Sequence, residues 1–84
     1  MYYIYLVLCN DQSIYTGVTE NLERRFYEHS HQKGGRHTKL NPAIQLLYSE
    51  SFVTKQEVLK RERQIKGWRR EKKLNLIKFG KPVI

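Results

Sequence analysis

Arg25 is a charged residue on what the sequence predicts to be the inner face of a helix. Leu22, Phe26 and His29 follow one another at helical intervals of four and three residues. Arg25 falls beside them on the same face, whereas its neighbour Arg24 points elsewhere. A guanidinium group in this position can hold two oxygens of a phosphate through its planar fork of donors.

Glu62 has a similar position in a later expected helix. It lies between Val58 and Ile65, four residues after the first and three before the second. The Lys and Arg residues around it can turn toward water, and we expect that Glu62 cannot do so fully. A charged group on an inner face is costly unless it is paired or binds a metal ion, and a carboxylate is a hard oxygen ligand suited to Mg²⁺.

Two interpretations of these residues are open at this point. In the first, Arg25 and Glu62 form a structural salt bridge, or their side chains reach past the edge of the apolar stripe into water. In the second, both groups lie in a half-buried cleft, where a low dielectric strengthens their action on a phosphate and a metal ion.

Three stretches of strand type should provide part of the scaffold. Residues 3–8 are a continuous apolar and aromatic run, and residues 14–18 resume that pattern after a turn-forming segment, which predicts a β-hairpin. Residues 43–52 form the third expected strand. The segment 32–42 between helix and strand contains Gly-Gly and Asn-Pro pairs, so we expect a basic loop there.

Helices are expected over 22–31, from the capping box at Thr54 and Glu57 to about residue 67, and over 68–79. The predicted order is therefore ββαβαα. This order favours an α/β fold in which a small three-stranded sheet is packed by helices. The length of 84 residues allows one domain, which we take as 1–84.

Charge is the most informative feature of the composition. Sixteen Lys and Arg against eight Asp and Glu give a formal net charge of +8, and nucleic acid is the commonest partner of such a surface. The expected contacts come from the basic loop and the C-terminal helices, namely Lys33, Arg36, Lys39, Lys66, Arg69, Arg70, Lys72 and Lys73. A merely solvated loop and helix face is the alternative.

Other compositional features narrow the setting. The single cysteine, Cys9, suits a small buried residue and gives no sign of an oxidising compartment. No apolar run has the length of a membrane span, so we expect a cytoplasmic protein without a membrane partner. The three histidines lack a zinc-ligand spacing. Trp68 is expected in the core rather than as a base-stacking platform.

The hairpin carries two short motifs. Residues 3–5 read Tyr-Ile-Tyr and residues 15–17 read Tyr-Thr-Gly. This pair resembles the Gly-Ile-Tyr and Tyr-Ile-Gly motifs of the GIY-YIG nucleases, whose arginine lies ten residues beyond the second tyrosine. Arg25 fills that position, and His29 matches a histidine that often follows four residues later. Glu62 fills the place of the family's metal-binding glutamate.

The match spans nearly the whole chain and includes departures from the family pattern. Tyr3 replaces the first glycine and Thr16 the isoleucine, whereas the structural glycine of the second motif is kept as Gly17. Val18 stands where the excision-repair branch of the family carries a lysine that supports catalysis. Within the family, the chain resembles the small standalone bacterial group without an attached DNA-binding domain.

The resemblance implies hydrolysis of a phosphodiester bond with one divalent ion, Mg²⁺ or Mn²⁺, leaving a 5′-phosphate and a 3′-hydroxyl. Tyr5 or Tyr15 would accept the proton of the attacking water, and Arg25 would hold the phosphate. Glu62 would bind the metal. His29 would orient the water, share the base role or bind a phosphate; its alternative is a structural hydrogen bond to a tyrosine.

The expected function is thus a metal-dependent endonuclease, acting on DNA in repair or recombination, without a small-molecule cofactor. The alternatives are a non-catalytic nucleic-acid-binding protein with the same fold and a ribosome-associated or structural basic protein. We expect the five catalytic candidates to converge on one concave, basic face. Substrate structure and oligomeric state are left open by the sequence.

Overall fold

The computed structural model describes residues 1–31 and 41–80. Its elements, in chain order, are β1 (Tyr2–Cys9), β2 (Ile14–Thr19), α1 (Leu22–Ser30), β3 (Ala43–Phe52), α3 (Lys55–Lys66) and α4 (Arg70–Phe79). The strands form one antiparallel sheet in the order β2-β1-β3, so β1 is central and pairs with both neighbours. The α/β fold and the ββαβαα order predicted from the sequence are confirmed.

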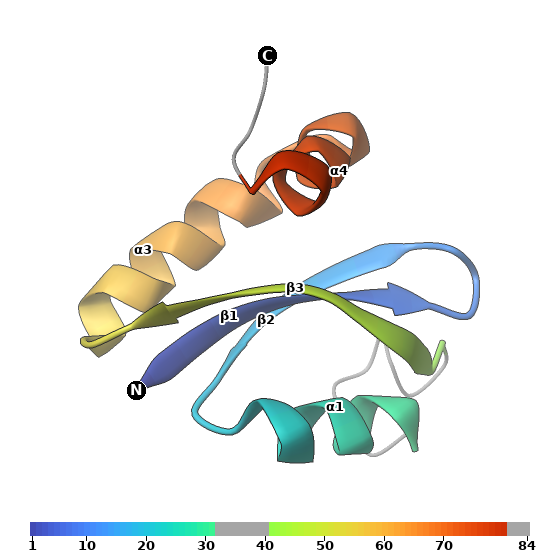
Figure 1. Ribbon diagram of the computed structural model, residues 1–84, viewed down its shortest axis with the longest axis horizontal. Helices are drawn as coiled ribbons and strands as arrows, with labels where there is room; N and C mark the ends of the chain where they lie inside the picture. Colours follow the sequence, from blue (N-terminus) through green and yellow to red (C-terminus); the bar gives the residue numbers. More distant parts are fainter. Residues whose placement is uncertain (32–40, 81–84) are drawn as a thin grey trace.

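The sheet lies between two layers of helices, with α3 and α4 on one face and α1 on the other (Figure 1). Ile4 and Leu6 face α3 and α4, where they form one core cluster with Val58, Ile65 and Leu76. The alternate residues of β1 face α1, where Tyr5, Val7, Cys9 and Ala43 form a second cluster that packs against Tyr15, Leu22 and Phe26. This alternation follows from the two-residue period of a strand, and it sends the two tyrosines toward α1.

Side chains at the N-termini fix where α1 and α3 begin. Asn21 caps α1, because its side-chain oxygen accepts a hydrogen bond from the Arg24 amide at 3.0 Å. Thr54 caps α3 by accepting from the Glu57 amide at 3.2 Å. The Glu57 carboxylate accepts from the Thr54 hydroxyl at 2.8 Å, rather than from the Thr54 backbone as the predicted capping box has it.

The last helix begins two residues later than the sequence predicts. Trp68 belongs to the turn between α3 and α4, and its side chain packs against the core cluster of the α3 side, as expected. Arg70 then ties the start of α4 to the hairpin, since Nη1 donates to the Gln12 carbonyl oxygen at 2.6 Å. Gln12 has the left-handed φ of 72° that this tight turn requires. The helix ends at Gly80, which has φ 73°.

The predicted basic loop lies outside the described residues, and with it Lys33, Arg36 and Lys39. Over residues 1–31 and 41–80, none of the helices combines the length and the apolar composition needed to cross a bilayer.

Candidate active site

Tyr5 and Gly17 are paired across β1 and β2, and the pairing explains the glycine. The Tyr5 ring lies directly over Gly17, so a Cβ at that position would collide with the phenol oxygen. Because β2 is an edge strand, this arrangement carries the Tyr5 hydroxyl toward the edge of the sheet. Gly17 is therefore needed for the close approach of a side chain, not for a special backbone conformation.

The Tyr5 hydroxyl is the centre of a small hydrogen-bonded cluster. It lies 2.7 Å from His29 Nε2, and the Arg25 Nε donates to it at 3.4 Å. Tyr5 is only 3% exposed and His29 is fully buried. The structural hydrogen bond that the sequence left as an alternative for His29 is thus present.

Burial has a large effect on the Tyr5 phenol. It raises the pKa of Tyr5 to about 12, with smaller contributions in the same direction from Tyr15 and Glu62. The hydrogen bond and the charge of Arg25 act against this increase and lower the pKa. Tyr5 is therefore a neutral phenol at pH 7. Arg25 Nε can only donate to the Tyr5 oxygen, so the phenol proton is available to His29 Nε2.

Two further residues border the cluster. Tyr15 packs its ring against both Tyr5 and His29, with centroid distances of 6.4 and 5.2 Å. Arg25 Nη1 also forms an ion pair with Glu28 Oε1 at 3.1 Å, in which the two side chains are 31% and 34% exposed. Part of the guanidinium group is consequently in contact with solvent. The sequence prediction that Tyr5, Tyr15, Arg25 and His29 come together is consistent with this geometry.

Glu62 differs from the other catalytic candidates in the layer of the fold that carries it. It belongs to α3, which packs on the opposite face of the sheet from α1 (Figure 1). The prediction of a single common face is therefore wrong for Glu62 as regards the helix that carries it. α3 contacts the edge strand β2. The charge of Glu62 makes the smallest of the contributions to the raised pKa of Tyr5.

Among the described residues, Arg25 and Glu62 each form an ion pair with a neighbour on their own helix, and not with each other. Glu62 Oε2 pairs with Lys66 Nζ at 3.3 Å, and the Glu62 side chain is 19% exposed. Arg25 pairs with Glu28 instead. Within residues 1–31 and 41–80, the structure contains no Arg25–Glu62 ion pair, although both side chains are partly buried as predicted.

The donor set suits a metal ion that keeps most of its own ligands. Among the described residues there is no group of three or more His, Cys, Asp or Glu side chains that could enclose a metal. Mg²⁺ is commonly held by one or two carboxylates together with water and substrate phosphate oxygens. The carboxylate of Glu62, whose side chain is 19% exposed, fits that mode of binding.

Sequence reasoning missed a second polar network, which lies on the α3 side. Arg61 donates to both oxygens of Glu50, at 2.9 Å from Nε and 3.0 Å from Nη2, and Tyr48 donates to Glu50 Oε2 at 2.6 Å. Burial alone would raise the pKa of Glu50, but these hydrogen bonds from Arg61 and Tyr48 lower it. The available signal was a lone glutamate in an otherwise uncharged strand, beside a helix rich in arginine.

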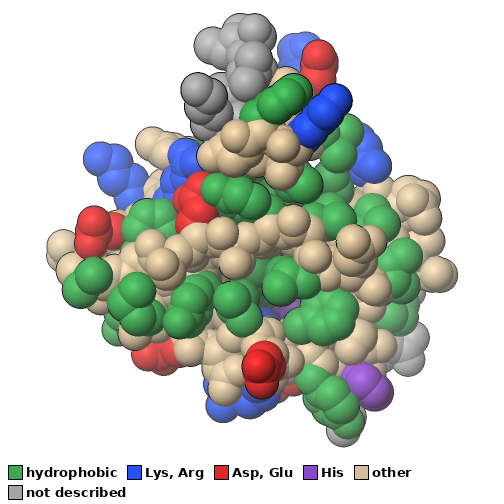
Figure 2. All heavy atoms as spheres, viewed as in Figure 1, with side chains coloured by type: hydrophobic (Ala, Val, Ile, Leu, Met, Phe, Trp, Pro, Cys, Tyr) green, Lys and Arg blue, Asp and Glu red, His purple; other side chains and the backbone are tan. Residues whose placement is uncertain are grey.

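The proposed nucleic-acid contacts lie where the charge is concentrated. Residues 55–80 contain ten Lys and Arg against three Glu, a net charge of +7, whereas residues 1–31 contain two Arg against four Asp and Glu, a net charge of −2. In Figure 2, blue side chains gather mainly over α3 and α4, and the band along β3 is largely hydrophobic.

The basic residues of the last two helices are not equivalent. Arg69 is exposed, and Arg70 holds the hairpin turn. Lys72 Nζ lies 4.5 Å from the centre of the Trp68 ring, in a cation–π contact. Lys73 is half-buried, and Lys66 is paired with Glu62.

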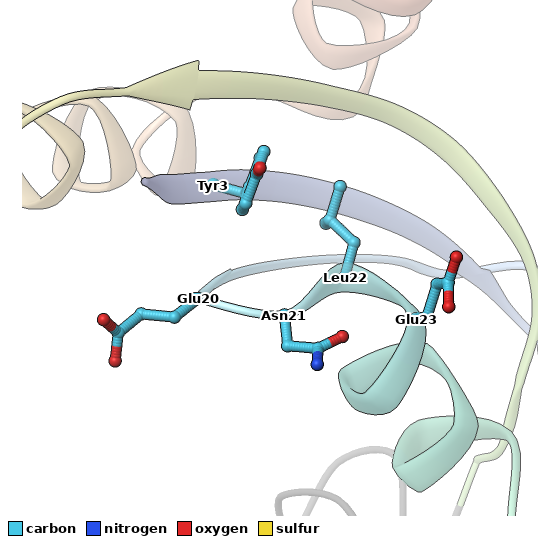
Figure 3. A pocket seen from close by; sticks show the side chains of 5 residues that line it. All are labelled: Tyr3, Glu20, Asn21, Leu22 and Glu23. Carbon is cyan, nitrogen blue, oxygen red and sulfur yellow. The ribbon is translucent and has the colours of Figure 1, made fainter.

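A shallow pocket at the start of α1 is separate from the phenol cluster (Figure 3). Leu22 extends from α1 toward β1, where Tyr3 stands, and the remaining lining residues are Glu20, Asn21 and Glu23. The two carboxylates repel phosphate groups, so this pocket is a poor place for a nucleic-acid backbone.

Comparison with known proteins gives a consistent result. The sequence matches the family described as the GIY-YIG catalytic domain over residues 1–75. The UPF0213 protein of Staphylococcus saprophyticus is 47% identical over 79 residues, which cover 94% of this chain and 96% of that protein. The UPF0213 protein of Staphylococcus epidermidis is 40% identical, with the same coverage of both chains.

A solved structure has the same fold. The solution NMR structure of the UPF0213 protein BH0048 from Bacillus halodurans is similar to this chain with a TM-score of 0.60 and 33% identity, covering 93% of this chain and 84% of the other. Sequence motifs, fold and relatives agree, and the chain belongs to the GIY-YIG family, among the small bacterial proteins named UPF0213.

Proposed function

We propose that the protein is a divalent-metal-dependent endonuclease that hydrolyses phosphodiester bonds of nucleic acid, with DNA in repair or recombination as the expected substrate. The observation that carries this proposal is the buried Tyr5–His29 hydrogen bond of 2.7 Å, with Arg25 donating to the same phenol oxygen. The charge of Glu62, on α3, makes a small contribution to the raised pKa of that phenol. In this proposal the Tyr5–His29 pair is the base, Arg25 is the phosphate-binding cation and Glu62 is the metal ligand.

Tyr5 and His29 together are the proposed proton acceptor. A phenol with a pKa of about 12 is a weak base when it acts alone, because it retains its own proton at pH 7. If the Tyr5 proton passes to His29 Nε2 as the attacking water gives its proton to the Tyr5 oxygen, no free phenolate has to form. Tyr15 then supports the cluster by packing against both rings.

Arg25 and Glu62 have complementary roles in the proposal. The exposed part of the Arg25 guanidinium binds oxygens of the scissile phosphate and stabilises the charge that develops there. Glu62 would hold one Mg²⁺ or Mn²⁺, which would supply Lewis-acid stabilisation of the departing 3′-oxygen. The ion pair with Lys66 offsets the charge of the Glu62 carboxylate in the folded chain until a metal ion binds there in place of Lys66.

The test is a screen of labelled substrates: duplex, flap, branched and single-stranded DNA and RNA, each with Mg²⁺ or Mn²⁺. Wild type is compared with Glu62→Gln, which keeps the shape of the side chain and removes its charge. Glu71→Gln is the matched control, since Glu71 is an exposed carboxylate on α4 away from the cluster. We expect cleavage to fall by about 10²–10³ only in Glu62→Gln, with metal binding weakened in parallel. A wild type that cleaves none of these substrates, yet binds them, would support the non-catalytic alternative.

Binding should be mainly electrostatic and independent of sequence. If about four to six phosphates are contacted by the basic helices and loop, the slope of log K against log salt should be about −4 to −5 on duplex DNA. Filter binding or anisotropy at several salt concentrations measures this slope. An affinity insensitive to salt would point to a different kind of partner.

A further inference from the structure

Another pocket lies between the end of β2 and the start of α3. Its volume of about 230 Å³ is below the range of roughly 300–1,000 Å³ that is usual for drug-sized ligands, so it suits a group of about the size of one base. It is lined by residues of β1, β2, α3 and the link that follows β2, namely Tyr2, Val18, Thr19, Glu20, Lys55 and Leu59. The pocket therefore lies between the edge strand of the sheet and the helix that carries Glu62.

The lining of this pocket combines an apolar surface with two opposite charges. Tyr2 and Val18 are half-buried and pack against the core cluster of the α3 side, and Leu59 is 38% exposed. Glu20 and Lys55 are both exposed, and within the described part of the chain neither of them forms an ion pair. A ligand that carries hydrogen-bond donors at one end and an anion at the other can satisfy both charges at once.

The pocket is close to the proposed metal ligand along α3. Lys55, Leu59 and Glu62 are separated by four and three residues, so they share one stripe of the helix. From Leu59 to Glu62 the helix rises by only about 5 Å along its axis. The same helix contacts β2, which provides the other wall of the pocket. A strand that is cut at Glu62 can therefore place an adjoining nucleotide in the pocket.

From this combination we propose that the pocket binds one unpaired guanine nucleotide of the substrate strand, next to the cleaved bond. Glu20 holds the base, and Lys55 holds the phosphate of the same nucleotide. The neighbouring pocket at the start of α1 lacks this ability, because it is lined by Glu20 and Glu23 without a cation. The inference rests on the proposed function, and it adds a base preference and the requirement that this base is unpaired.

The choice of guanine follows from the hydrogen-bonding groups of the bases. An ionised carboxylate such as that of Glu20 only accepts hydrogen bonds, and it has two oxygens. The Watson–Crick edge of guanine presents two adjacent donors, the ring N1–H and the N2 amino group, which match these oxygens. Adenine and cytosine present one amino donor beside a ring nitrogen that accepts, and thymine and uracil present one N–H between two carbonyl groups. A duplex occupies this edge with the partner base, so the guanine must be unpaired.

Guanosine 5′-monophosphate and inosine 5′-monophosphate test this pocket without any cleavage, because they differ only in the N2 amino group. By NMR titration, wild type should bind the guanosine nucleotide about tenfold more tightly, as expected for one additional charge-assisted hydrogen bond. The amide resonances of Glu20, Lys55 and Leu59 should shift. The adenosine, cytidine and uridine monophosphates should bind no more tightly than the inosine nucleotide. Tighter binding of any of them than of the guanosine nucleotide, or shifts confined to other residues, would overturn the inference.

Two variants separate recognition of the base from recognition of the phosphate. Glu20→Gln should remove the preference for guanosine, and Glu23→Gln is the control that neutralises an exposed carboxylate of the neighbouring pocket. Lys55→Gln should weaken the guanosine and inosine nucleotides by the same factor, and Lys60→Gln is the control on an exposed position of α3. A preference that persists in Glu20→Gln, or binding that Lys55→Gln leaves unchanged, would overturn the inference without affecting the proposed function.

On a strand that the enzyme cleaves, inosine can replace guanine at one position at a time on each side of the cut. At one position close to the cut, this replacement should slow wild type about tenfold more than it slows Glu20→Gln. If cleavage persists and no position distinguishes the two proteins, the inference is wrong and the proposed function stands. If the guanosine nucleotide binds in the pocket as expected and no nucleic acid is cleaved, the pocket is retained and the proposed function is wrong.

Discussion

Two polar clusters, each with a tyrosine and an arginine, lie on opposite faces of the same sheet. On the α1 face, Arg25 makes one long hydrogen bond of 3.4 Å to Tyr5 and an ion pair with the half-exposed Glu28. On the α3 face, Arg61 clamps both oxygens of Glu50, which also accepts from Tyr48. Burial raises the pKa of both tyrosines to about 12.

The two clusters differ in how many of the hydrogen-bond donors of their arginine have partners within the fold. The Arg61 network is closed, because the guanidinium group of Arg61 donates to both oxygens of the Glu50 carboxylate and Tyr48 donates the remaining hydrogen bond. The Arg25 cluster is open, because part of its guanidinium faces solvent and is available to a phosphate. A closed network stabilises the fold, and an open one can bind a substrate.

Arg25→Ala should have the largest effect, and this effect should be on rate. Loss of one transition-state donor reduces cleavage by about 10²–10³, whereas the surface pair with Glu28 contributes only about 0–1 kcal/mol to stability. Cleavage and thermal unfolding are measured on the same protein, with the exposed neighbour Arg24→Ala as control. A loss of about 3–5 kcal/mol in Arg25→Ala would make its cluster structural and remove the contrast.

Arg61→Met should act on stability instead. It leaves the Glu50 carboxylate without its main partner, in a site where the two side chains are 23% and 19% exposed. We expect the free energy of unfolding to decrease by about 2 kcal/mol, below the value for a fully buried pair because of this exposure. Arg63→Met is the control on the exposed face of α3, and it should change the free energy of unfolding by less than about 0.5 kcal/mol. Urea denaturation measures the free energy of unfolding of both variants. An equal decrease in the two would show that the Arg61–Glu50 pair contributes nothing to stability.

Alkaline pH should destabilise the protein through Tyr5. The pKa of this phenol is about 12 in the fold and near 10 when unfolded, so its contribution is complete below about pH 10 and is lost as the pH rises to about 12. By pH 11 the loss should be about 1 kcal/mol relative to pH 9. Tyr5→Phe should lack this component of the pH dependence. An unchanged slope in that variant would mean that Tyr5 is not buried as a neutral phenol.

Thr16→Val should give the smallest effect, a gain in stability. The Thr16 hydroxyl is buried and has no hydrogen-bond partner among the described residues, on the otherwise apolar side that faces α3. Removing it without changing the shape should stabilise the fold by up to about 1 kcal/mol. Thr19→Val is the matched control on the same strand, because the Thr19 hydroxyl accepts from the Asn21 amide at 3.1 Å and its loss should destabilise. A Thr16→Val variant less stable than wild type would indicate a partner for that hydroxyl.

Much of the fold could be predicted because its signals are local. The period of two along β1 and the intervals from Leu22 to His29 report which face of an element is buried, and Asn21 and Thr54 mark helix starts through their own backbone contacts. The partial burial of Arg25 and Glu62 follows from the same periodicity. The start of α4 was missed because Trp68 is held in a turn by packing, and propensity does not report packing.

By itself, the sequence determined the elements, the faces of the catalytic candidates and the excess of positive charge toward the C-terminus. Only the tertiary structure decided that the Tyr5 ring crosses Gly17 toward the sheet edge and that the helix carrying Glu62 packs on the opposite layer. It also decided that Arg61 closes on Glu50 and that Arg70 bonds the hairpin turn at Gln12. These contacts join side chains from different elements. Their geometry depends on how helices pack on a twisted sheet, which no periodicity along the chain encodes.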